Sequence, residues 1–454
     1  MPHASRPTSD RHLFVAFCLL IVWAPIPLGS NRVWAMQLLQ AWVALISAGL
    51  CWQVARGQLE LAPALRKAWL PTAMLSGIVL WTLIQILPQP LSPLDPYTRN
   101  LTSGYLALQK GIAYSLFFLC ALQLLSTPQR LERAAHIIVL SGVIQAVYAV
   151  LVSLGGPSFD LLGLKLIHPS KDATTGTFVN RNHLAGYLEM SLAAGIGLLM
   201  AKLESSAPDM GWRERSRRML RALLEGKARV RLFLVIMVIA LVMTHSRMGN
   251  GAFFASMGIS AVIGFLVYRK VSRSLVILFA SMIAIDLFIV SAWFGLDKLA
   301  NRIEQTRISE EVRLDVNANA WLWIQEHWLS GSGAGSFGSQ FPAYRTADVS
   351  PFFDFAHNDY LQILGEYGVI GSAFFLMIVL SSLWAAIMAQ RQRQNQVLRG
   401  MAFAAMMGII SLMIHASVDF NHYIPANAML FVLLCAFAWA SLSMDSSRQK
   451  RRQS

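Results

Sequence analysis

The feature that most constrains this chain is a series of apolar segments, each close to the length that crosses a membrane. A membrane-spanning helix needs about 20 mostly apolar residues, and twelve segments approach that length: residues 13–28, 34–53, 69–87, 111–126, 135–155, 183–201, 231–245, 250–268, 274–294, 364–389, 400–415 and 425–443. Because 55% of the 454 residues are hydrophobic and only 14% are charged, the composition excludes an ordinary soluble domain. The sequence therefore predicts an all-α polytopic membrane protein with about twelve transmembrane helices.

The distribution of basic residues predicts how the chain is oriented in the membrane. Lys and Arg accumulate in loops on the cytoplasmic side. With the N-terminus inside, 26 of the 38 Lys and Arg residues fall in cytoplasmic segments, which explains the formal net charge of +14. We therefore expect both termini on the cytoplasmic side. The basic loop at residues 202–230 has no interleaved aromatic residues, so we expect it to face anionic lipid and not nucleic acid.

This topology divides the chain into three regions. Residues 1–294 hold transmembrane helices one to nine, with an outer loop at 156–182 and the basic loop at 202–230; residues 295–363 form the sizeable outer loop domain; and residues 364–454 hold the last three transmembrane helices and a basic tail. Helical spacing in residues 302–328 predicts an interfacial helix with Trp321, Trp323 and Trp328 at headgroup depth. The glycine-rich residues 330–338 predict a tight turn, because no strand precedes them to form a dinucleotide site; a backbone nest for phosphate is the alternative.

Four short polar clusters interrupt the apolar pattern. They are Asn-Arg-Asn-His at 180–183, His-Ser-Arg at 245–247, His-Asn-Asp-Tyr at 357–360 and His-Ala-Ser-Val-Asp-Phe-Asn-His at 415–422. The topology places all four on the outer face of the membrane. Ionisable residues next to membrane-spanning segments are costly and are commonly functional. Their shared location therefore predicts an active site.

Arg181 and Arg247 are candidate ligands for a phosphorylated group. Guanidinium groups stay charged at neutral pH and bind the oxygens of phosphate groups through two parallel hydrogen bonds. Two of them on one face would suit a diphosphate. The alternative is that both are interfacial residues satisfied by headgroups, with Asn180 or Asn182 capping the adjacent helix.

His357 is the candidate general base. An imidazole has an ordinary pKa near 6.5, which suits the uptake of a proton from a hydroxyl group at neutral pH. A structural histidine that only makes hydrogen bonds is the alternative. His415, Asp419 and His422 resemble a metal-binding set, but no fourth ligand is indicated, so we expect a hydrogen-bonded lining and no metal.

These residues, taken together, resemble a known family. Gly-Thr-Phe-Val-Asn-Arg-Asn-His-Leu-Ala-Gly at 176–186, Ser-Arg at 246–247 and His-Asn-Asp-Tyr-Leu-Gln-Ile-Leu-Gly-Glu-Tyr-Gly at 357–368 are similar in order and spacing to motifs of the O-antigen ligase and O-antigen polymerase superfamily of Gram-negative inner membranes. Pro-Ile-Pro-Leu-Gly-Ser at 25–30, Gly-Ser-Gly-Ala-Gly-Ser-Phe at 331–337 and Asp-Phe-Asn at 419–421 extend the resemblance over nearly the whole chain.

The resemblance implies a GT-C-like, metal-independent and inverting glycosyltransferase with a periplasmic active site. Its donor would be a glycan linked to undecaprenyl diphosphate, held by Arg181 and Arg247, and His357 would deprotonate the acceptor. The implied partners are the donor, a lipid A-core or other saccharide acceptor, and membrane lipids; no cofactor is implied. Seven further polar residues would support the site: Asn180, Asn182, Ser246, Asn358, Asp359, Asp419 and His422.

Two versions of this function differ in the acceptor that they use. A ligase would deliver a finished polymer to lipid A-core, whereas a polymerase would extend a second lipid-linked repeat; the single main outer domain favours the ligase. A transporter is the alternative from another class, and intramembrane Glu189 and Asp286 are compatible with it. However, transporters concentrate polar groups near the middle of the membrane, and these clusters lie at one end.

Overall fold

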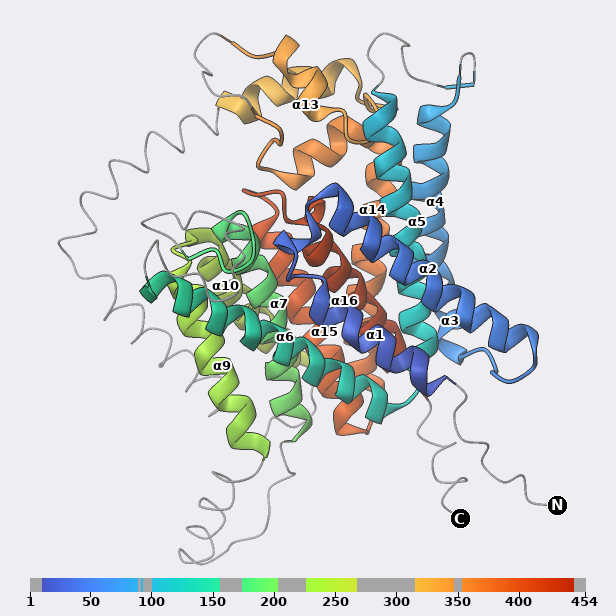
Figure 1. Ribbon diagram of the computed structural model, residues 1–454, viewed down its shortest axis with the longest axis vertical. Helices are drawn as coiled ribbons and strands as arrows, with labels where there is room; N and C mark the ends of the chain where they lie inside the picture. Colours follow the sequence, from blue (N-terminus) through green and yellow to red (C-terminus); the bar gives the residue numbers. More distant parts are fainter. Residues whose placement is uncertain are drawn as a thin grey trace, which may run out of the picture.

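The computed structural model describes residues 10–88, 91–92, 100–155, 174–202, 226–267, 315–346 and 353–444. Every regular element in these ranges is a helix (Figure 1). The long helices are α1 (Arg11–Trp23), α2 (Val33–Ala55), α4 (Trp69–Ile86), α5 (Leu101–Leu124), α6 (Pro128–Gly155), α7 (Arg181–Ala201), α9 (Gly226–Met243), α10 (Arg247–Val267), α14 (Asp359–Gln392), α15 (Gln396–His415) and α16 (Pro425–Ser443). Shorter elements are η1 (Leu28–Ser30), α3 (Pro63–Lys67), α13 (Phe337–Gln340), η2 (Phe341–Ala343) and η3 (Asn421–Tyr423), and residues 315–326 are also helical.

Nine of the helices in the described ranges are long and apolar enough to cross a membrane, which agrees with a polytopic membrane protein. Helix α1 is apolar but spans only 13 residues, and α9, which begins with a basic segment, is not among the nine. The predicted span at 274–294 lies outside the described residues, as do most of the predicted outer loop at 156–182 and the first part of the predicted domain at 295–363.

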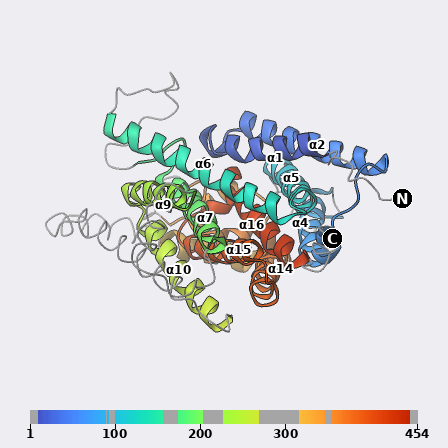
Figure 2. The same ribbon diagram turned by 90° about the horizontal axis from the view of Figure 1, so that it is seen from below.

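Helix α7 forms the centre of the bundle. It is surrounded by α6, α9, α10, α15 and α16 (Figure 2), and its most apolar stretch is completely buried. Its closest neighbour is α15, where a Cβ atom added to Gly197 would lie 2.4 Å from the backbone oxygen of Gly400. Small residues allow such a close approach between membrane helices. Helix α7 is therefore packed tightly into the core of the bundle.

The segment at 315–346 is attached to the first half of α14. Trp323, Phe337 and Phe341 form a small apolar core there, and Ser332 N donates a hydrogen bond to Gly365 O at 2.8 Å. The predicted exposure of Trp323 to lipid headgroups is wrong, because its side chain is fully buried against Gly365, where an added Cβ would overlap the indole ring. The other two tryptophans of that prediction, Trp321 and Trp328, are exposed.

The predicted tight turn at 330–338 is confirmed by its backbone. Gly331, Gly333 and Gly335 have φ angles of 73°, 110° and 74°, which L side chains rarely adopt. The amide groups of Gly335 and Phe337 donate to the buried carboxylate of Glu366, at 2.9 and 3.3 Å. This carboxylate takes the place that a phosphate would need, so the alternative of a phosphate nest does not hold for these two amides.

Candidate active site

Three helices begin at one end of the bundle, which we call the site end, and each begins with the same local device. A capping side chain comes immediately before a charged first residue: Asn180 before Arg181 in α7, Ser246 before Arg247 in α10, and Asn358 before Asp359 in α14. Asn180 Oδ1 accepts from the amide of Asn182, Ser246 Oγ from that of Gly249, and Asn358 Oδ1 from those of Tyr360 and Leu361. Such caps satisfy amides that the first helical turn leaves without partners.

The caps also define the roles of three predicted supporting residues. Asn180, Ser246 and Asn358 use a side-chain oxygen to begin a helix, so each positions the charged residue that follows it. A basic residue at a helix N-terminus opposes the helix dipole, at a cost of about 0.3–1 kcal/mol. Arg181 and Arg247 are both exposed first residues of this kind, so helix stability does not explain their placement.

The N-termini of α7 and α10 lie side by side. A Cβ atom added to Gly249, in the first turn of α10, would lie 2.6 Å from Cβ of Ala185, which is one helical turn below Arg181. Each terminus presents backbone amides and the positive end of a helix dipole, which together attract anions. The two arginines therefore stand at adjacent, anion-attracting helix ends.

His357 lies directly before the cap of α14 and faces a buried carboxylate. Its Nδ1 atom is 3.4 Å from Oδ1 of Asp419, whose side chain is 0% exposed, while the imidazole is 24% exposed. His357 has a φ of 51°, a left-handed conformation that is uncommon for residues other than glycine and recurs at functional sites. The geometry leaves Nδ1 directed inward and the rest of a partly exposed ring available to a substrate.

Asp419 lies in the loop that joins α15 to α16 and is shared by three imidazoles. Nε2 of His183 is 3.9 Å from Oδ1, and Nε2 of His415 is 4.0 Å from Oδ2. Burial by itself raises the pKa of Asp419, but contact with His357 and the nearby His183 and His415 hold that pKa below its ordinary value. Asp419 is thus an anion placed behind His357.

Phe420 fixes the rings around this carboxylate. Its ring contacts His183 edge-on at 4.6 Å between centroids and His357 at 4.8 Å, and it stacks on Phe355 at 4.2 Å. The amide of Phe420 donates to Asp419 Oδ1 at 2.9 Å. One loop therefore orients the carboxylate and restrains the imidazole of His357.

The remaining supporting residues form a second pair. Nδ1 and the backbone amide of His422 lie 2.7 and 3.1 Å from Oδ2 of Asp359. The amide of Asp359 donates to Ala416 O at 2.9 Å. Asp359 and His422 therefore tie the start of α14 to the 416–424 loop, while Asn182 is partly buried in the first turn of α7.

The structure brings in His183 and Glu189, which were not assigned to the site from the sequence, and it gives His415, expected only as part of a hydrogen-bonded lining, a specific position. His183 and His415 belong to the polar clusters, but their convergence on Asp419 depends on helix packing. Glu189 lies two turns inside α7, is 0% exposed, and contacts His415 Nδ1 at 2.8 Å and Ser411 Oγ at 2.7 Å. A carboxylate inside an apolar helix was the signal that could have identified it.

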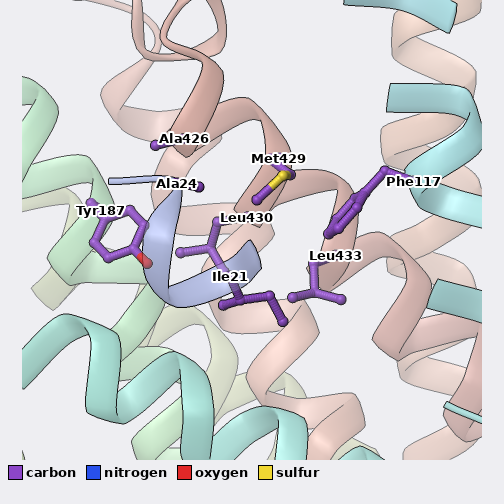
Figure 3. Close-up of a pocket in the computed structure, with 8 residues that line it drawn as sticks. All are labelled: Ile21, Ala24, Phe117, Tyr187, Ala426, Met429, Leu430 and Leu433. Carbon is purple, nitrogen blue, oxygen red and sulfur yellow. The ribbon is translucent and has the colours of Figure 1, made fainter. Parts of the chain in front are cut away.

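No metal site is formed by the described part of the chain: no group of three or more His, Cys, Asp or Glu side chains there is arranged to hold an ion. An apolar crevice lies on the α1 side of α7 and α16 (Figure 3). It is lined by Ile21, Ala24, Phe117, Tyr187, Ala426, Met429, Leu430 and Leu433. Its lining lacks the ionisable groups of the site end, so it is separate from the candidate active site.

Comparison with known proteins supports the family resemblance. A search of curated proteins gave no match. Residues 232–376 match the family model described as O-Antigen ligase, and this segment includes Arg247 and His357 but neither Arg181 nor Asp419. Candidate membrane spans lie within the matched residues and on both sides of them along the chain. The match confirms the resemblance of this chain to the O-antigen ligase and O-antigen polymerase superfamily.

Proposed function

We propose that the chain transfers a finished O-antigen polysaccharide from undecaprenyl diphosphate to a hydroxyl group of lipid A-core, at the periplasmic face of the bacterial inner membrane. The family match supports a glycosyltransferase that acts on lipid-linked glycans. The observation that carries the proposal is the site end itself. It contains two adjacent helix N-termini, each of which begins with an arginine. It also contains a histidine that lies next to a buried carboxylate.

In this proposal Arg181 and Arg247 bind the donor diphosphate. The diphosphate gains negative charge as the glycosidic bond breaks, and fixed guanidinium groups and helix amides stabilise that charge in the transition state. Diphosphate is already a good leaving group, so the proposed reaction requires no metal. The polyprenyl chain stays in the bilayer beside the bundle.

His357 is the proposed general base. Its Nδ1–H faces Asp419, which leaves Nε2 to take the proton from the acceptor hydroxyl as the oxygen attacks the anomeric carbon. The bond to the diphosphate breaks on the opposite side, so the configuration at that carbon is inverted. Asp419 stabilises the imidazolium that results, because the carboxylate lies 3.4 Å away and is shielded from water.

The periplasmic placement is supported by the distribution of charge along the helices. Helix α14 begins at the site end and finishes at the opposite end, where Arg393 donates to Leu442 O near the end of α16. That opposite end also carries Lys67, the last residue of α3, whose Nζ donates to Ser443 O at 3.3 Å, and Arg130 in the first turn of α6. Basic residues mark the cytoplasmic side, so the site end is assigned to the periplasm.

Deletion of the gene in a host with smooth lipopolysaccharide tests the ligase assignment. We expect lipid A-core without polymer and accumulation of polyprenyl-linked chains. Products that carry a single repeat would indicate the polymerase instead. Complementation with His357→Ala should fail to restore transfer although the protein is made and binds donor, and normal transfer by that variant would exclude the base role.

A further inference from the structure

A buried carboxylate and imidazole lie behind the proposed catalytic pair and have no role in the steps above. Glu189 and His415 belong to α7 and α15, and both side chains are 0% exposed. Their closest atoms, Oε1 and Nδ1, are 2.8 Å apart, and Ser411 Oγ donates to Oε2 of Glu189 at 2.7 Å. A buried carboxylate is costly without such partners.

His415 lies between two carboxylates. Its Nδ1 faces Glu189 at 2.8 Å and its Nε2 faces Oδ2 of Asp419 at 4.0 Å. A neutral imidazole has one nitrogen that only accepts hydrogen bonds, and that nitrogen would face a negative oxygen. An imidazolium directs an N–H to each side, and two nearby anions favour it. The arrangement therefore fits a positively charged His415.

Resting on the function proposed above, we propose that Glu189 is a positioning residue for the His357 base. Glu189 holds His415 as an imidazolium, and this positive charge lies 4.0 Å from Oδ2 of Asp419, the carboxylate whose Oδ1 faces His357 Nδ1. A series of neighbouring charged groups, Glu189, His415 and Asp419, thus leads from the interior of α7 to the partly exposed base.

The uptake of one proton by His357 neutralises the net charge of this series of groups. Before reaction, Glu189 and Asp419 are anionic and His415 is cationic, so one negative charge faces His357. When His357 Nε2 takes the hydroxyl proton, that charge is neutralised, and the protons on His415 and on His357 Nδ1 stay where they are. Among the described residues, the series is also faced by His183 in α7, by Asp359 at the start of α14 and by His422, which pairs with Asp359.

Glu189→Gln tests the proposal in the full-length protein, reconstituted with an undecaprenyl-diphosphate glycan as donor and lipid A-core as acceptor. Without the Glu189 charge, His415 becomes neutral and no longer offsets Asp419. We expect kcat to fall about tenfold or more, as a part of the roughly 10²–10⁴-fold that a positioned base contributes. The KM for donor should stay unchanged, and the acid limb of the pH–kcat profile should move to higher pH.

Two further variants separate charge from packing. Glu189→Asp keeps the charge and should keep the wild-type acid limb even if its kcat is lower. Ser191→Ala is the matched control, because Ser191 is buried in the same helix but faces Gly142 of α6. It should leave both kcat and the pH profile unchanged.

The outcomes also separate this inference from the proposed function. If His357→Ala abolishes transfer while Glu189→Gln keeps the wild-type kcat and acid limb, the positioning role is wrong and the base assignment stands. A lower unfolding temperature with an unmoved acid limb would also overturn the inference, since it indicates a structural role alone. If His357→Ala retains full activity, the proposed function itself fails.

Discussion

Replacement of Asp419 by asparagine isolates the charge behind the proposed base. Asparagine has nearly the same shape, and its side-chain oxygen can still accept the hydrogen bond from Phe420 N. The variant therefore removes a negative charge from a site that is 0% exposed while leaving the loop geometry in place. The expected defect lies in the proton-transfer step and not in donor binding.

The size of the expected loss in kcat follows from the distance between His357 and Asp419. Unit charges separated by the 3.4 Å between His357 Nδ1 and Asp419 Oδ1 interact by about 5 kcal/mol at an effective dielectric constant of about 20. The amide dipole of asparagine and the partial exposure of His357 replace part of this energy, so we expect a net loss of about 2–3 kcal/mol in the transition state. At about 1.4 kcal/mol per factor of ten, kcat should fall roughly 30- to 150-fold.

The assay is single-turnover transfer from a polyprenyl-diphosphate glycan to lipid A-core in proteoliposomes, with donor affinity measured separately. Asp354→Asn is the matched control, because Asp354 is an exposed carboxylate three residues before His357 and should be neutral. Turnover by Asp419→Asn within about twofold of wild type, in protein with an unchanged unfolding temperature, would refute the assignment of Asp419 as the partner of the base.

Three further predictions concern the anion site, the metal and the fold. Arg181→Lys or Arg247→Lys should reduce transfer by about tenfold or more, because an ammonium group lacks the planar pair of donors that grips a diphosphate; normal donor binding and turnover in both variants would remove these residues from the donor site. Treatment with a chelator should leave transfer unchanged, and activity that is lost and then restored by one divalent ion would revive the metal alternative. Gly368→Ala should destabilise the protein by about 2–5 kcal/mol, through strain and overpacking, because Gly368 has a φ of 64° and an added Cβ would lie 2.2 Å from Leu329 O. Gly251→Ala, at an open helical position, is its control in thermal unfolding.

The helices and the polar clusters could be predicted from the sequence because both depend on local patterns. A long apolar segment must form a helix in a membrane, where every backbone group needs a partner within the segment. Most matching helices of the described residues begin close to the predicted positions, but α5, α6, α9 and α14 begin at Leu101, Pro128, Gly226 and Asp359 and not at 111, 135, 231 and 364. The start of α14 was missed because its first turns pack on protein and need no continuous apolar face.

The sequence by itself determined that ionisable residues cluster at helix ends, including Arg181, Arg247 and His357. Only the tertiary structure decided which of their neighbours act together. Glu189 and His415 are 226 positions apart in the chain and meet because α7 and α15 pack against each other along their length. Trp323 was misplaced for the same reason: spacing along a helix indicates a face, but which partner covers that face depends on the packing of distant segments.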